Sequence, residues 1–199
     1  SYEVRETPAV IRSRTTHHLW FVRNRPEMPA TTIFGIFGRT NFQRSPEYIT
    51  LRDEWLRQAA AQKSNKMVRL NAVEFVQEIE PDVAKQLLKG GMAIDPTVYE
   101  YPFQLLRLAR SELDDVDKEI TADERTVLNR RILDLGRTSL ALITKERSED
   151  RDANRGELTI NMCRSALETG DMALAESLGR DLVVEFGSEI GNAAYSQAS

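Results

Sequence analysis

The chain has few of the residues on which active sites and metal sites depend. Its 199 residues include one cysteine, Cys163, and two histidines, His17 and His18. A single cysteine excludes an intrachain disulfide and a CxxC metal motif, and adjacent histidines point in different directions on a strand or a helix. A Ser-His or Cys-His nucleophile system has little to draw on. We therefore expect no catalytic residue, no metal site, no cofactor and no enzymatic activity.

Long apolar runs are also absent from the sequence. The longest apolar stretch near the N-terminus, residues 33–37, is far shorter than the roughly 20 residues that span a bilayer. We expect no membrane span. A lone thiol suits a reducing, intracellular compartment, with a virion or an organelle as the alternatives.

Lysine is missing from the first 45 residues, and its absence marks a change of composition along the chain. Residues 1–45 hold seven of the 27 basic residues, all arginines, and three of the 31 acidic residues, a net charge of +4. The other 154 residues hold 20 basic and 28 acidic residues, a net charge of −8. We predict a basic, aromatic-containing extended arm (1–45), a helical domain (46–187) and a polar C-terminal tail (188–199).

Two short apolar patches lie inside the arm, at residues 19–22 and 33–37. Both are rich in aromatic and β-branched residues, and Pro26 and Pro29 lie between them. This composition is typical of strands, but a lone hairpin is only marginally stable in water. We therefore expect an extended arm, able to form short β-strands, that lies against the body or against another chain.

Helix signals begin at Ser45, a good N-cap that is followed by a proline suited to the first helical position. Thr121 and Glu124 match a capping box, which starts the longest helix. Apolar stripes at helical spacing follow each start; the first contains Tyr48, Leu51, Trp55 and Ala59. Helix starts or breaks are further expected at residues 62–66, Pro81, Gly90-Gly91, Asp95-Pro96, Pro102 and Gly170-Asp171.

Amphipathic helices joined by short loops predict an all-α fold, either an antiparallel helical bundle or stacked helical hairpins. Residues 170–175 resemble the turn and second helix of a tetratricopeptide hairpin, and no second copy lies 34 residues upstream. This likeness predicts a helical hairpin and no family. Cys163, one turn from Ile160 and from Leu167, is expected to be a small buried hydrophobe.

The candidate binding residues all lie in the arm. Arginine and aromatic side chains are interleaved there, and both types dominate protein–protein hot spots. Arginine also pairs with carboxylates in a planar, bidentate geometry. The partner-binding residues that we predict are Arg12, Arg14, Trp20, Phe21, Arg23, Arg25, Phe34 and Phe37.

Three hypotheses of function follow from the arm. In the first, the protein is a non-enzymatic structural or adaptor subunit of a larger assembly and grips neighbouring protein subunits, copies of itself or others, with the arm. In the alternative, it is a nucleic-acid-associated or regulatory helical protein that binds a single strand by phosphate contact and base stacking. The overall charge of −4 favours a protein partner. In the third, the arm folds back on the acidic body of its own chain.

Overall fold

The computed structural model describes residues 7–28, 45–143 and 151–186, and within these ranges it has eight α-helices and no strand. The predicted all-α class is confirmed, and the helices form a bundle. The chain divides into two compact units, Ser1–Pro96 and Thr97–Ser199. The division predicted from composition, into 1–45, 46–187 and 188–199, stays a prediction, because much of the arm and the tail lies outside the described residues.

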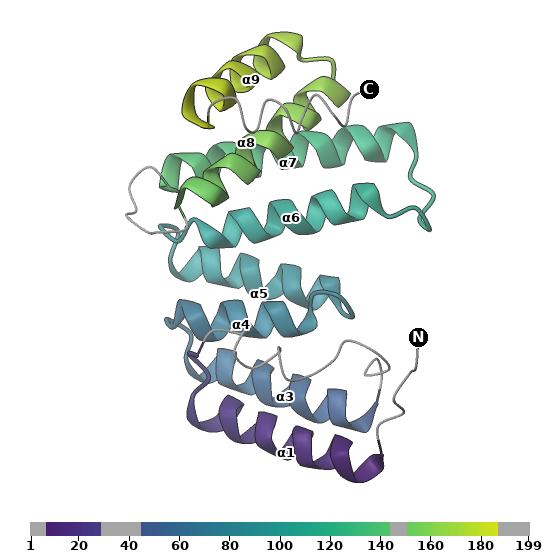
Figure 1. Ribbon diagram of the computed structural model, residues 1–199, viewed down its shortest axis with the longest axis vertical. Helices are drawn as coiled ribbons and strands as arrows, with labels where there is room; N and C mark the ends of the chain where they lie inside the picture. The colour runs from purple at the N-terminus through teal and green to yellow at the C-terminus, as the bar shows by residue number, and fades with distance from the viewer. Residues whose placement is uncertain (1–6, 29–44, 144–150, 187–199) are drawn as a thin grey trace. The chain divides into compact units, whose positions relative to one another are not determined.

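The first unit is a stack of helices in which each helix packs on the next along the chain (Figure 1). Its helices are α1 (Pro8–Asn24), α3 (Pro46–Ala61), α4 (Lys66–Val76) and α5 (Pro81–Ile94). Side-chain caps start three of them. Thr7 and Ser45 accept hydrogen bonds from backbone N–H groups at 3.4 and 3.1 Å, and each precedes a proline; Asn65 caps α4 at 3.3 Å. The starts predicted at Pro46 and Pro81 are confirmed.

The apolar patch at residues 19–22 is helical, so the extended conformation and the strand predicted for this part of the arm are wrong. Thr7 and Pro8 provide a cap and a first-turn proline. Thr15, His18 and Val22 then recur at i, i+3 and i+7 and are buried together. This tertiary burial overrides the strand-like composition, because β-propensity depends on context. The second patch, residues 33–37, lies outside the described residues.

The core of the first unit surrounds Trp55, whose side chain is fully buried on α3. Val22 of α1 and Ala72 of α4 pack around it, together with Ala59. The predicted stripe of α3 is confirmed, since all four of its members are buried. Helix α1 thus contributes side chains to the same core as α3 and α4.

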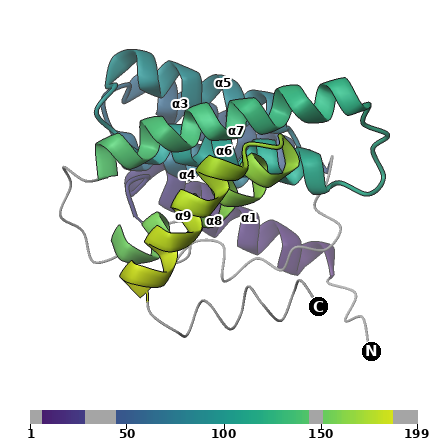
Figure 2. The same cartoon turned by 90° about the horizontal axis from the view of Figure 1, so that it is seen from above.

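The second unit contains α6 (Glu100–Asp114), α7 (Ala122–Ile143), α8 (Arg151–Glu168) and α9 (Met172–Phe186). Figure 2 shows α9 lying over α8 and inclined to α7. The capping box is confirmed, with Thr121 N–H donating to Glu124 at 2.9 Å and Glu124 N–H donating to Thr121 at 3.2 Å. Buried apolar side chains of α6, α7 and α8, including Leu106, Ile132 and Leu158, form its main cluster.

Two predicted helix boundaries are wrong. Gly90-Gly91 does not end α5, which continues to Ile94 because Gly91 is buried inside it. Asp95-Pro96 does not start a helix either, since α6 begins at Glu100. Pro102 then lies in the first turn of α6, where a missing N–H costs no hydrogen bond.

Helices α7 and α8 approach closely at Gly136. A Cβ at this position would overlap Cγ and Sδ of Met162 and lie 3.4 Å from Leu106 Cδ1. Met162 is itself buried between Leu133 and Ala166, so it has little room to move away. Glycine is therefore required at position 136 by packing and not by backbone conformation.

We predict that Gly136→Ala destabilises the protein, because overpacking a filled core costs about 1–3 kcal/mol and outweighs the better helix propensity of alanine. Gly179→Ala is the matched control: a Cβ there meets nothing within 4 Å, so the same change should stabilise α9 slightly. Thermal melts followed by circular dichroism should move in opposite directions for the two variants. Equal shifts would contradict this account of the α7–α8 contact.

Candidate interaction surfaces

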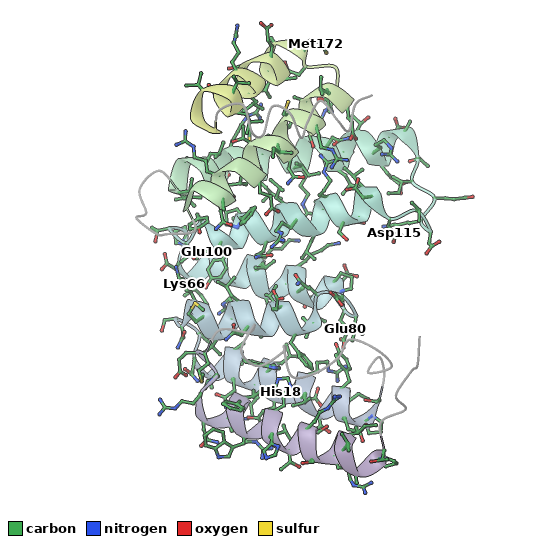
Figure 3. The ribbon with its side chains drawn as sticks, in the orientation of Figure 1. His18, Lys66, Glu80, Glu100, Asp115 and Met172 are labelled. Atoms are coloured by element: carbon green, nitrogen blue, oxygen red, sulfur yellow. The ribbon has the colours of Figure 1, made fainter. Side chains whose placement is uncertain are left out.

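His18 packs helix α1 against the rest of the first unit. Its side chain points from α1 toward α3 (Figure 3). Its imidazole meets the edges of Trp55 and Phe75, with ring centroids 6.3 and 5.7 Å apart. The side chain is 1% exposed, and this burial lowers the pKa of His18 to about 4. His18 is therefore neutral at pH 7 and acts as part of the core.

The chain that follows α1 is fixed by a second contact. Asn71 of α4 donates from Nδ2 to the backbone carbonyls of Pro26 and Met28, at 2.8 and 2.6 Å. Asn71 is buried, so these two bonds satisfy a polar group that has little access to water. Helix α1 and the segment after it are thus each fixed to the rest of the unit by a specific side chain, His18 and Asn71.

The predicted binding residues take different positions on α1. Trp20 is 55% exposed on the outer face, while Phe21 is half-buried against the core and meets Trp20 edge-on at 5.3 Å. Arg12 and Arg23 are exposed and, by helical spacing, flank Trp20 on one side. Arg14 is half-buried, and Arg25 lies beyond the helix, 4.0 Å from Glu27. Phe34 and Phe37 lie outside the described residues.

Arg23 folds back on an acidic residue of its own chain. Its Nε lies 3.4 Å from Oε2 of Glu54, on α3. Glu54 is 8% exposed and also accepts hydrogen bonds from Arg57 and from Gln58. These donors, Arg57 foremost, lower the pKa of Glu54 against the opposing effect of burial. At Arg23, the expectation that the arm contacts its own acidic body is met.

A groove of about 560 Å³ opens in the second unit between α6 and α8. Its lining is Arg107, Arg110, Ser111, Asp114, Asp115, Glu157 and Asn161. Two charges of the lining pair with each other and a third pairs outside it: Arg107 pairs with Glu157 at 3.0 Å, and Asp114 lies 3.8 Å from Arg164 of α8. Figure 3 labels Asp115, where α6 ends.

Arg110 lines this groove and links α6 to α8 directly and to α7 through Glu168. Its guanidinium donates to Ser165 Oγ at 2.6 Å, to the Asn161 carbonyl at 3.1 Å and to Glu168 at 3.3 Å. The other carboxylate oxygen of Glu168 accepts from Asn129 of α7 at 2.8 Å. Burial lowers the pKa of Arg110, and Glu168 partly offsets that effect. This network was not predicted from the sequence, although Arg110 lies on the apolar face, one turn from Leu106 and from Leu113.

The groove is lined by polar and charged side chains. Its lining has neither histidine nor cysteine, and its arginines are engaged in ion pairs. Across the described residues no three His, Cys, Asp or Glu side chains gather as a metal site requires. No helix in those ranges is both long and apolar enough to cross a membrane.

Cys163 is half-buried and packs beside the cluster of α7, α8 and α9. Its thiol donates to the Ala175 carbonyl at 3.5 Å, and burial raises the thiol pKa. Both effects favour the unreactive, protonated form. The neighbours used to predict its burial are nevertheless exposed, Ile160 at 38% and Leu167 at 50%. The packing face of α8 is therefore rotated from the one that the sequence predicted.

Comparisons with protein-family models, with curated proteins and with solved structures found no match.

We predict that the first unit loses stability as the pH falls from about 6.5 to 4. The pKa of His18 is lowered in the folded state, so the unfolded chain takes up the proton first, and the loss reaches about 2 kcal/mol at pH 5. Urea unfolding followed by tryptophan fluorescence reports this unit, because Trp20 and Trp55 both lie in it. His18→Leu should flatten the pH dependence over this range; an unchanged slope would contradict the assignment.

We also predict that Arg110→Met destabilises the second unit by about 2 kcal/mol or more, because the partly buried Glu168 and the buried Ser165 lose their guanidinium partner. Arg107→Met is the matched control in the same groove. Its ion pair is half exposed, so its loss should cost about 1 kcal/mol at most. Thermal melts of both variants test the difference. Equal losses of stability would contradict the larger contribution assigned to the Arg110 network.

Proposed function

We propose that this protein is a non-enzymatic structural or adaptor subunit that binds another protein through the outer face of α1, centred on Trp20. The supporting observation is the exposure of Trp20, at 55%, on a helix whose opposite face buries Thr15, His18 and Val22. An indole left in water on an ordered helix gains apolar burial when a partner covers it. Tryptophan is also among the residues most enriched in binding hot spots.

The surroundings of Trp20 favour an ordered contact. The Phe21 ring packs edge-on against the indole, and Phe21 itself rests on the core. Such support reduces the rotamer freedom that Trp20 would lose on binding, and this saves part of the entropic cost of association. A partner that meets this face needs an apolar pocket for the indole.

The polar neighbours of Trp20 indicate the chemistry of the partner's rim. Arg12 and Arg23 lie on one side of the indole, and His17 and Asn24 lie on the other, all exposed. The arginines suit carboxylates on the partner. An apolar pocket bordered by acidic residues is the surface that fits this face.

The test is affinity purification of the tagged full chain from its source, with quantification of the proteins that accompany it and of absorbance at 260 nm. Trp20→Ala should remove a defined partner, because loss of a hot-spot residue weakens binding by about 2 kcal/mol or more, roughly 30-fold. Ile49→Ala, at a 43% exposed position of α3 in the same unit, is the control and should retain the partner. Circular dichroism should show that both variants are folded.

Equal recovery of every protein with Trp20→Ala and with Ile49→Ala would contradict the proposal. The same outer face also suits a single-stranded nucleic acid, since the exposed indole can stack on a base while Arg12, about two turns away on the same helix, contacts a phosphate. Binding of labelled oligonucleotides that falls steeply with salt, and that is lost in Trp20→Ala, would favour this alternative.

A further inference from the structure

Helix α9 packs on α8 through one face and leaves apolar side chains on the other. Ala175 and Leu178 are buried against the second unit's core. Met172, Val183 and Val184 are 63%, 59% and 86% exposed. Figure 3 labels Met172, at the start of α9. Three large apolar side chains on about four turns of helix are more than a wholly solvated face needs.

The exposed face also carries a charge pair and a glycine. Glu176 and Arg180 form an ion pair at 3.1 Å, and each side chain is 69% exposed. Gly179 lies between them in the sequence, and a Cβ built on it meets nothing within 4 Å. Met172, Glu176, Gly179 and Val183 are spaced by four, three and four residues, so they form one stripe along the helix.

We infer that this stripe binds the same stripe of a second copy of the chain, with the two α9 helices antiparallel about a two-fold axis. The stripe is self-complementary in that arrangement. The axis falls midway between Met172 and Val183, so Met172 of each copy faces Val183 of the other. Glu176 of each copy then lies within one residue of the level of Arg180 of the other. Such an interface is isologous, the commonest kind in soluble oligomers.

The proposed arrangement explains why a glycine, Gly179, lies in the interior of a helix, where it costs about 1 kcal/mol relative to alanine. It lies within two residues of the proposed axis, where the two backbones are closest. The absence of a side chain there allows the helices to approach and the flanking apolar side chains to meet. Glu176 and Arg180 border the contact and fix its antiparallel direction, because a parallel pair would oppose like charges.

The expected dimer is weak. A stripe on one helix is smaller than the surface of about 800 Å² per partner that a standard interface buries. We therefore expect a dissociation constant in the micromolar range or above. The contact uses the second unit alone and does not depend on the partner proposed for α1.

The experiment is charge reversal on the full chain, measured by sedimentation over a concentration series. The unaltered chain should dimerise. Glu176→Arg gives a stripe with two positive charges and Arg180→Glu gives one with two negative charges, so each variant alone should be monomeric. An equimolar mixture should regain the dimer, because opposite stripes then face each other. Both positions are exposed, and circular dichroism of each variant checks the fold.

Val183→Asp tests the apolar contact, with Val127→Asp as the control at an equally exposed valine of α7, 63% exposed. We expect the first to abolish dimerisation and the second to leave it intact. A chain that stays monomeric up to about millimolar concentration would overturn the inference. So would a dimer that survives Val183→Asp, which would place the interface elsewhere, or a mixture of the charge variants that fails to associate. A monomer that dimerises only after removal of residues 187–199 would show that this segment occupies the face instead.

Discussion

Each helix of this protein can bury only one or two stripes of side chains, so each depends on the helices beside it. Trp55 is fully buried because α1, α3 and α4 all contribute to its surroundings. A helix that packs on its neighbours through one face keeps the opposite face in water. In the described residues, α1 packs on α3 and α9 packs on α8, and their outer faces carry Trp20 and Met172. Both proposed interfaces follow from this limit on what a single helix can bury.

Buried polar side chains decide how these helices fit together. Arg69 of α4 donates to the carbonyls of Lys63 and Leu87, at 2.9 and 3.1 Å, and so ties α4 to the loop before it and to α5. Arg110 plays the same part among α6, α7 and α8. Apolar contacts tolerate sliding, whereas a guanidinium with fixed acceptors loses several hydrogen bonds when one helix shifts by a turn. Each arginine therefore helps to specify the register of the helices within its own unit.

The sequence predicted the helices well wherever local chemistry determines them. The cap at Ser45, the capping box at Thr121 and the Gly170-Asp171 turn depend on neighbours in the chain, and the structure has them all. Gly170 has a φ of 76°, a conformation that glycine adopts without strain. Helix α1 was missed because its helical state depends on burial of His18 and Val22 against distant residues. Composition alone cannot reveal such contacts.

The candidate binding residues stay a prediction, and the sequence alone could not show how their side chains are placed. Interleaved arginines and aromatic residues marked the segment, but only the helix separates Trp20, which faces water, from Phe21, which faces the core. The Arg110 network had a visible signal, an arginine on an apolar stripe, yet its acceptors lie more than 50 residues away. The spacing of Glu176, Gly179 and Arg180 is plain in the sequence, but their exposure is not.

The contrast between a basic N-terminal segment and an acidic remainder has a consequence for the proposed interface on α1. Arg23 is already close to Glu54, whose carboxylate is buried and bound by Arg57 and Gln58 as well. A partner's carboxylate must compete with Glu54 for Arg23, so the gain from a new ion pair there is small. Burial of Trp20 must then supply most of the affinity for a protein, with a shallow dependence on salt. Phosphates bound along this face would instead release counterions and give a steep dependence. The salt dependence of binding at α1 therefore separates the two kinds of partner on physical grounds.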